Sequence, residues 1–210
     1  MGHVPHLLLD GEWASGEVKV TGEHLAHLTR VLRLEDGASV SYTDGAGTVG
    51  EGQLRDGHVV RGTEWQQQRP SDLVVVVAPV DNRDRSRFMV EKLSELGVAE
   101  LRFLKTRYGQ GRAPRGDRLR SWAVAGLEQS RGAWLMRVSP VEIVISDLSG
   151  VYAVCEPGGS AEVPHARTVV IGPEGGWAPG EIPESAIRLH LGDTVLRVET
   201  AAIVAAARMI

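Results

Sequence analysis

The sequence contains a single cysteine, Cys155, among its 210 residues. One cysteine excludes an intramolecular disulfide and a thiolate zinc cluster, and it fits a protein of the reducing cytosol. No apolar run approaches the roughly 18 residues that are needed to span a bilayer. The amino terminus shows no secretory signal, and His6 stands where a myristoylation pattern needs Ser or Thr. We therefore expect a cytoplasmic protein without a membrane segment.

Several common catalytic signatures are missing as well. The glycines of 172–176 are not followed by the Gly-Lys-Ser/Thr of a phosphate-binding loop, and the spacing of the dinucleotide fingerprint is absent. No Gly-x-Ser-x-Gly elbow is present, which argues against an α/β-hydrolase. His24 and His27 lie three residues apart without a nearby third ligand, so no metal site is expected. Cys155 lies among strand residues without an obvious histidine partner, which favours a buried structural thiol.

The charge is unevenly distributed along the chain. The net charge is −4, and the 42% hydrophobic and 24% charged residues indicate a globular chain rather than a disordered one. Residues 83–120 carry eleven Lys/Arg against five Asp/Glu, a local balance of +6, which leaves −10 for the remainder. A basic segment on an acidic body suits a localised phosphate contact, although an Arg-rich solvated surface would look the same.

The first 68 residues predict a small β-rich unit with one helix. Short strands are expected at 6–9, 17–20, 38–42, 48–54 and 58–64, and apolar residues at helical spacing predict a helix over 22–32. Asp44-Gly45 between two such runs is typical of a hairpin. A polar, Pro-containing stretch follows, and we place the linker at 69–72.

The remainder, 73–210, alternates strands with helices, which predicts an α/β fold with a parallel sheet. Strands are expected at 73–79, 101–104, 141–145, 151–155, 168–171 and 187–191. Helices are expected at 84–96, 117–130, 180–186 and 200–208, with Gly97 as a stop signal and an Arg/Gly-rich loop at 107–116.

Glycines follow three of these strands late in the chain. Ile171 leads into Gly172-Pro173-Glu174-Gly175-Gly176-Trp177, Leu191-Gly192 follows another strand, and Cys155-Glu156-Pro157-Gly158-Gly159 follows a third. Such glycines allow positive φ and let a ligand lie against bare backbone. Because open α/β sheets bind ligands at the carboxyl ends of their strands, these loops predict a site for a flat, neutral-to-cationic ligand. A tight connection without a ligand is the alternative.

Two of these motifs carry a family resemblance. Ile171–Gly176 followed by Glu181, with Leu191-Gly192 and Val195–Ala201, resembles the 16S ribosomal RNA (uridine-N3) methyltransferase family of the SPOUT superfamily. The resemblance extends over nearly the whole chain. His27–Arg33 with Asp44-Gly45 looks like that family's PUA-like RNA-binding domain, Glu91–Val98 like its first catalytic-domain helix, and Glu128–Ser130 like a further block.

The resemblance implies a PUA-like β-barrel domain at 1–68 and a trefoil-knotted SPOUT methyltransferase domain at 73–210 that acts as a homodimer. It implies S-adenosylmethionine as the cofactor, no metal, and ribosomal RNA or the small ribosomal subunit as the partner. The residues implied for cofactor binding are Cys155, Glu156, Pro157, Ile171, Gly172, Pro173, Glu174, Gly175, Gly176, Leu191, Gly192, Thr194, Val195, Leu196 and Arg197. Those expected to contact RNA phosphates are Arg30, Arg33, Arg83, Arg85, Arg87, Arg107 and Arg112.

Arg197 and Glu199 are the expected catalytic residues. Uridine N3 is a poor nucleophile until its proton leaves, so a cation that stabilises the uracil anion would assist transfer, and Arg197 is the candidate. Glu199 would orient Arg197 or accept the proton. A structural ion pair at the start of the last helix is the alternative for both.

The sequence departs from the family pattern at three places. Thr194 stands where the family usually has Arg, Arg131 is displaced by one residue with Gly132 in its place, and Ala178 replaces a capping Ser or Thr. These departures keep other functions open: methylation of a different RNA nucleotide, a non-catalytic RNA-binding or assembly protein, or a nucleotide-binding protein that uses the glycine loops.

Overall fold

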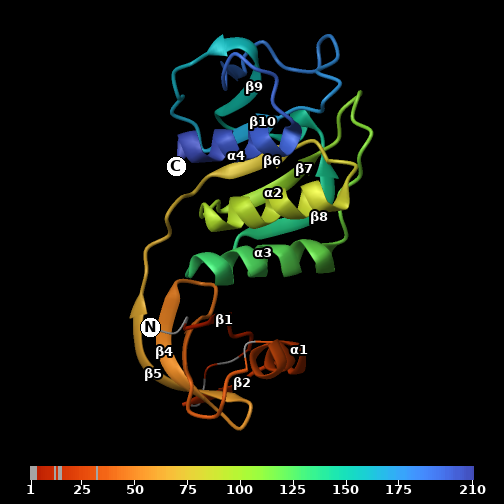
Figure 1. Ribbon diagram of the computed structural model, residues 1–210. Helices are drawn as coiled ribbons and strands as arrows, with labels where there is room; N and C mark the ends of the chain where they lie inside the picture. The colour runs from red at the N-terminus through yellow and green to blue at the C-terminus, as the bar shows by residue number, and fades with distance from the viewer. Residues whose placement is uncertain (1–3, 12, 14–15, 32) are drawn as a thin grey trace. The chain divides into compact units, whose positions relative to one another are not determined.

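A computed structural model describes residues 4–11, 13, 16–31 and 33–210, and it divides into two compact units (Figure 1). The first unit comprises residues 1–69 with 127–135, and the second comprises 70–126 with 136–210. The chain therefore passes from one unit to the other at Arg69–Pro70, inside the predicted linker. It returns to the first unit at the end of helix α3 (Gly116–Ser130).

The first unit is built on a curled five-stranded sheet in the order β1-β3-β4-β5-β2. Its strands are β1 (His6–Leu8), β2 (Glu17–Lys19), β3 (Ser39–Thr43), β4 (Thr48–Arg55) and β5 (His58–Gln66). The predicted helix over 22–32 is shorter than expected, because α1 (Gly22–Ala26) gives way to a π-helical turn, η1 (His27–Val31). Buried Leu7, Leu28, Tyr42, Leu54 and Val59 lie in one core cluster, so a sequence with few aromatics still builds an apolar interior here.

The second unit is built on a six-stranded parallel sheet in the order β11-β9-β10-β6-β7-β8. Its strands are β6 (Val74–Val77), β7 (Glu100–Leu104), β8 (Arg137–Ile143), β9 (Tyr152–Ser160), β10 (Thr168–Ile171) and β11 (Ile187–Leu189). Its other elements are α2 (Arg83–Glu95), the 3-10 turn η2 (Ile145–Asp147) and α4 (Val198–Met209). The predicted parallel α/β sheet is confirmed.

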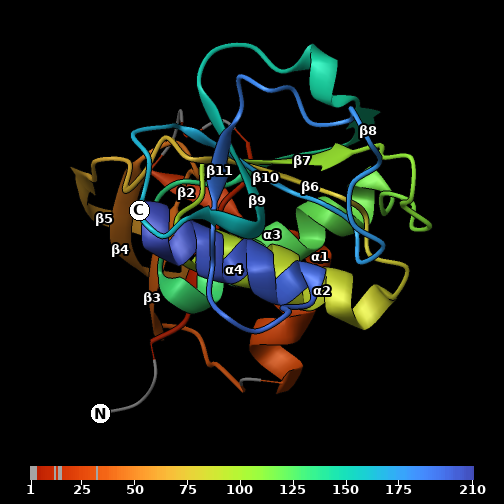
Figure 2. The same ribbon diagram turned by 90° about the horizontal axis from the view of Figure 1, so that it is seen from above.

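Helices α2 and α4 pack side by side, and α4 also packs on β6 and β10 (Figures 1 and 2). The central strands β6 and β10 are buried along most of their length, as their β-branched runs predict. Asn82 caps α2 by accepting a hydrogen bond from the Arg85 amide at 2.9 Å, and Gly97, with φ of 79°, ends it. The cap thereby fixes the first residues of α2 shortly after the end of β6.

Three expected elements of the second unit differ from the structure: one is absent and two have other bounds. Residues 180–186 form turns rather than a helix, because Gly180 has φ of 73° and Pro183 disfavours a helical residue before it. Strand β8 begins at Arg137, earlier than predicted, and includes Pro140; an edge strand tolerates proline, and β8 lies at the edge. Strand β9 does not end at Cys155 but continues to Ser160.

His6 is buried in the first unit and gives a test of its stability. One ring nitrogen lies 2.9 Å from the Ser41 hydroxyl, and the other lies 3.0 Å from the Gly132 carbonyl. Burial holds the pKa of His6 below its usual 6.5, so the folded protein favours the neutral ring. Stability from this group is complete above pH 6.5 and is lost as the pH falls through the folded pKa, by at most about 1.4 kcal/mol per pH unit.

We expect His6→Gln, which cannot gain a proton, to unfold with a shallower dependence on pH below 6.5 than the unsubstituted protein. Urea denaturation at pH 7.5, 6.0 and 5.0 measures the free energy of unfolding for both proteins. Because all other titrating groups are shared, their contribution cancels in the difference. Parallel pH profiles for the two proteins would contradict this role of His6.

Candidate functional site

A cavity of about 630 Å³ lies at the carboxyl edge of the parallel sheet. The segments after β10 and β11, the far part of β9 and the start of α4 form its walls. Fourteen of the fifteen residues expected to bind the cofactor line it, and Gly175 is the exception. The sequence reasoning did not assign six further lining residues to the cofactor: Arg85, Trp177, His190, Asp193, Val198 and Ala201. Most of them are neighbours in the sequence of the glycine motifs, and this proximity could have assigned them to the cofactor site.

Gly172 lets the loop after β10 close against Trp177. A Cβ at Gly172 would lie 2.6 Å from Cε2 of the indole, closer than real contacts allow, so a larger residue would displace the ring. Glu181 secures the other side of this loop, because its carboxylate accepts hydrogen bonds from the amides of Ala178 at 2.9 Å and Arg107 at 2.8 Å. The Glu181 carboxylate thus accepts a hydrogen bond from the amide of Ala178, the residue that stands where a capping Ser or Thr was expected.

Strand β9 forms the opposite wall. Cys155 pairs with Ile171 of β10, and the strand then continues past the end of β10 through Pro157 to Ser160. Gly159 lies so close to β11 that a Cβ there would be 2.7 Å from the carbonyl carbon of Arg188. The predicted third loop is therefore an irregular stretch of strand. Burial raises the pKa of the Cys155 thiol to about 12, so Cys155 is neutral and not a nucleophile at physiological pH.

An ion-pair network joins α2, the glycine loop and α4. The Arg85 guanidinium donates to the two Glu199 oxygens at 2.8 and 2.6 Å and also to Glu174. Glu199 is buried in the first turn of α4, whereas Glu174 is largely exposed. The hydrogen bonds from Glu199, followed by those from Glu174, raise the pKa of Arg85, which therefore stays charged. Arg85 connects two walls of the cavity.

This network bears on two of the expected site roles. Arg85 holds Glu199, and among the described residues Glu199 makes no ion pair with Arg197. The expected orienting role would require such a pair. The Arg85 hydrogen bonds lower the pKa of Glu199, which makes this carboxylate a weak base. Arg85 itself is engaged by two carboxylates and is only partly exposed, so a phosphate would have to compete with these pairs, and the expected contact at this position stays a prediction.

Arg197 stands at the N-cap of α4 and lines the cavity with an exposed side chain. Within the described part of the chain, its guanidinium makes no hydrogen bond or ion pair. Thr194 lies exposed on the same wall, and the neighbouring Val195 is 98% exposed. An exposed cation at the cavity wall can stabilise negative charge that develops on a bound molecule.

The remaining expected RNA contacts are exposed arginines: Arg30 and Arg33 in the first unit, and Arg83, Arg87, Arg107 and Arg112 in the second. Arg87 pairs with Glu91 one turn along α2 at 2.6 Å, so its charge is partly neutralised by that carboxylate. His24, considered as a metal ligand, lies 3.6 Å from Glu128, and the side chain of His27 lies outside the described residues. The described residues contain no cluster of His, Cys, Asp or Glu suited to a metal ion.

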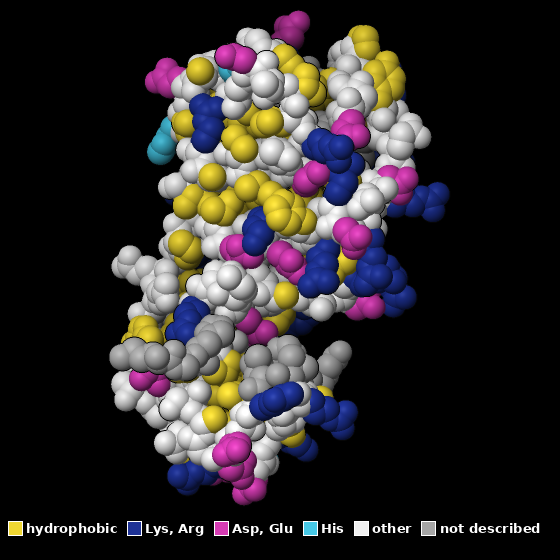
Figure 3. Space-filling model, in the orientation of Figure 1, with side chains coloured by type: hydrophobic (Ala, Val, Ile, Leu, Met, Phe, Trp, Pro, Cys, Tyr) yellow, Lys and Arg dark blue, Asp and Glu magenta, His cyan; other side chains and the backbone are white. Residues whose placement is uncertain are grey.

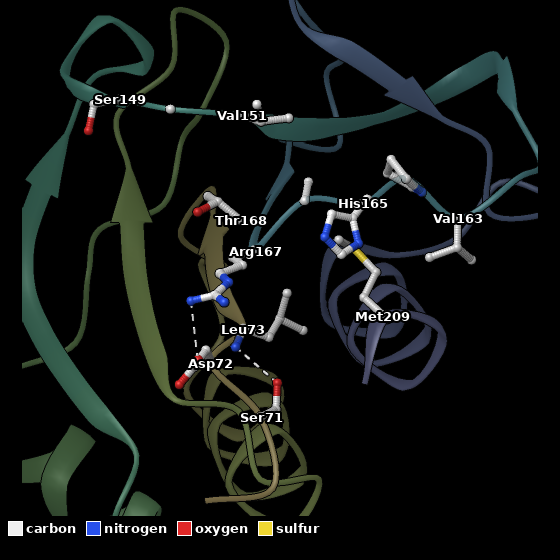
Figure 4. A pocket seen from close by; sticks show the side chains of 13 residues that line it. Ser71, Asp72, Leu73, Ser149, Val151, Val163, His165, Arg167, Thr168 and Met209 are labelled. Carbon is white, nitrogen blue, oxygen red and sulfur yellow. Dashed lines mark hydrogen bonds and ion pairs between the residues drawn. The ribbon is translucent and has the colours of Figure 1, made fainter.

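A second cavity, of about 740 Å³, lies at the opposite end of the sheet (Figure 4). It is lined by residues that precede β6, β9 and β10, including His165, beside Met209 at the end of α4. Asp72 and Arg167 face one another there at 3.3 Å, both largely exposed. Ligands of open α/β sheets bind at the carboxyl ends of the strands, so the glycine-lined cavity is the functional candidate.

Comparison with known proteins identifies relatives of this chain. A family model described as RNA methyltransferase domain matches residues 67–210. Ribosomal RNA small subunit methyltransferase E of Mycobacterium bovis is 30% identical, with 89% of this chain and 83% of the relative covered. The Synechocystis protein of the same name is 25% identical over 91% of this chain and 72% of its own length.

A solved structure has the same fold. The ribosomal RNA small subunit methyltransferase E of Neisseria gonorrhoeae, bound to S-adenosyl methionine, superposes with a TM-score of 0.82 at 23% identity. The superposition covers 98% of this chain and 96% of the Neisseria chain. No helix among the described residues is long and apolar enough to cross a membrane.

Proposed function

This chain belongs to the ribosomal RNA small subunit methyltransferase E family, and we propose that it transfers a methyl group from S-adenosylmethionine to N3 of a uridine in small-subunit ribosomal RNA. The observation that carries the proposal is the cavity at the carboxyl edge of the sheet, with the exposed Arg197 on its wall. Its volume of about 630 Å³ lies within the usual range for small-molecule sites.

The cavity suits S-adenosylmethionine because its walls combine bare backbone with apolar surface. Gly172, Gly176 and Gly192 leave main-chain groups accessible for hydrogen bonds to the adenosine and methionine parts, and Ile171 and Leu196 supply apolar contact. The bound cofactor supplies an electrophilic methyl group. The protein's own task is then to align N3 behind that methyl group and to favour the deprotonated base.

Arg197 stabilises the uracil anion in this mechanism. When N3 loses its proton, negative charge spreads onto the two carbonyl oxygens of the base, and the exposed guanidinium attracts that charge. The bound cofactor would supply the methyl group to N3, and the proton of N3 would leave to solvent. Glu199 does not accept the proton, because its interaction with Arg85 lowers its pKa; it holds the start of α4, where Arg197 is attached.

The first 68 residues act as a PUA-like RNA-binding domain, joined by residues 69–72 to the methyltransferase domain at 73–210. Exposed Arg30 and Arg33 support RNA binding by the first domain. Family membership supports a carboxy-terminal segment threaded as a trefoil knot and a cytoplasmic location, where ribosomal RNA is available. The target base must be unpaired or unstacked to enter the cavity.

The active form is a homodimer. Val195 on the cavity wall is 98% exposed, which is unusual for a branched apolar residue beside a binding site. Hydrophobic side chains also gather where α2 and α4 lie (Figure 3), and Phe88 and Ile210 are each about half exposed. A second copy that covers this surface would complete the site.

Incubation of the protein with unmethylated small ribosomal subunits and S-adenosylmethionine tests this function, and mass spectrometry of RNA digests locates the product. We expect one methyl group on N3 of one uridine. A methyl group on another nucleotide would contradict the assigned substrate. Binding of subunits without transfer would support the alternative of a non-catalytic RNA-binding protein, which the exposed Thr194 in place of Arg favours.

A further inference from the structure

The loop after β7 carries an exposed tyrosine beside the cofactor cavity. Tyr108 is 45% exposed, and within the described residues its ring and hydroxyl have no hydrogen-bond or ring partner. It does not line the cavity itself. Its Cβ and carbonyl oxygen pack on the outer side of the glycine loop, since a Cβ at Gly175 would lie 3.3 Å from the former and 3.5 Å from the latter. The Tyr108 ring is thus accessible to solvent beside the cofactor cavity.

Three contacts hold this loop in place. The Arg107 amide donates to Glu181 at 2.8 Å, so the loop after β7 is joined to the loop after β10. The Thr106 side chain packs against Gly109, where a Cβ would lie 2.6 Å from its oxygen, and its buried hydroxyl has no hydrogen-bond partner among the described residues. Gly111 packs on the carbonyl of Pro79, two residues after β6, too closely for any side chain. Tyr108 stands between these anchors, so little conformational freedom remains for a ligand to remove.

The surroundings of Tyr108 are cationic. Arg107 precedes it and Arg112 follows four residues later, both exposed and without a salt bridge among the described residues. An aromatic ring flanked by free guanidinium groups is the usual platform for unpaired nucleic acid, in which bases stack on the ring and phosphates contact the cations. An acidic peptide would use the cations but would leave the ring without a role.

We propose that Tyr108 stacks against an unpaired nucleotide next to the target uridine, while Arg107 and Arg112 bind the adjoining phosphates. This inference rests on the proposed function, because it places a neighbouring nucleotide of the same RNA. Tyr108 acts outside the cavity, so it binds RNA and leaves the cofactor untouched. It holds the strand beside the cavity so that the next base can enter.

The substitution Tyr108→Ala isolates the ring, because alanine keeps both the Cβ and the carbonyl that contact the glycine loop. We expect the subunit concentration for half-maximal methylation to rise about tenfold. The cofactor dissociation constant and the rate at saturating subunits should stay within about twofold, because the cavity is unchanged. Tyr108→Phe, which retains the stacking face, should behave like the unsubstituted protein.

Three results would overturn the inference: no effect of Tyr108→Ala, a parallel loss of cofactor affinity, or an equal loss in Tyr108→Phe. The second would show that the ring supports the cavity, and the third that the hydroxyl rather than the ring binds. The unsubstituted protein separates this inference from the proposed function. If it methylates subunits and Tyr108→Ala does so equally well, only the stacking role fails; if it neither binds nor methylates them, the function fails.

Discussion

Replacement of Arg197 by alanine is expected to lower the rate of methyl transfer by about 100- to 1000-fold. The side chain is exposed on the cavity wall and, among the described residues, makes no hydrogen bond or ion pair that the change would break. The loss should therefore appear in the reaction rather than in folding. Single-turnover transfer to small ribosomal subunits measures the rate, and calorimetric titration measures the affinity for S-adenosylmethionine, which should change by less than about threefold.

Arg167→Ala serves as the matched control for Arg197→Ala. Arg167 is also an exposed arginine of the second unit, but it lies in the cavity at the amino ends of the strands, where it faces Asp72. The Arg167→Ala variant should transfer methyl groups at the same rate as the unsubstituted protein. A large loss of cofactor affinity in Arg197→Ala, with normal transfer once the cofactor is saturating, would show that Arg197 binds the cofactor and does not stabilise the base.

Arg85→Ala is expected to have the largest effect on stability. The change leaves the buried Glu199 carboxylate without its cation and frees Glu174 on the glycine loop. Loss of one partner of a buried pair costs roughly 3–5 kcal/mol, and partial exposure of Arg85 reduces the expected value to about 2–3 kcal/mol. Cofactor affinity should fall as well, since Arg85 holds together two walls of the cavity. Urea denaturation and calorimetric titration measure the two effects.

Two further variants separate the ion pair from the loss of an arginine as such. Arg87→Ala, on the same helix, removes an exposed pair with Glu91 and should cost less than about 0.5 kcal/mol. Glu199→Gln combined with Arg85→Ala removes the uncompensated charge, so it should regain part of the stability lost in Arg85→Ala. Equal destabilisation by Arg85→Ala and Arg87→Ala would contradict the structural role of Arg85.

The sequence was informative wherever local chemistry decides the structure. The β-branched runs before Ala78 and at Thr168–Ile171 form the buried strands β6 and β10, because few other structures tolerate such runs. The glycines after β10 and β11 lie around one cavity, because the carboxyl ends of parallel strands share one edge of the sheet.

The sequence was less informative where contacts between residues far apart in the chain determine the structure. Strand β8 was expected only from residue 141, and its place at the sheet edge is what makes Pro140 acceptable within it. Arg85 looked like one more cation of a basic segment, because a sequence does not show that Glu199, 114 residues away, reaches the same guanidinium. The stretch after Cys155 looked like a loop, since its pairing with β11 depends on a strand far along the chain.

Titration of the protein with S-adenosylmethionine, alone and with small ribosomal subunits present, tests the assignment of the cavity most directly. We expect binding at micromolar strength, about −8 kcal/mol, because the cavity walls combine accessible backbone with apolar surface. Substitution of Gly172 by valine should abolish this binding, since any side chain there displaces Trp177. No binding under either condition, together with binding of ATP, would contradict the account and would favour a nucleotide-binding protein.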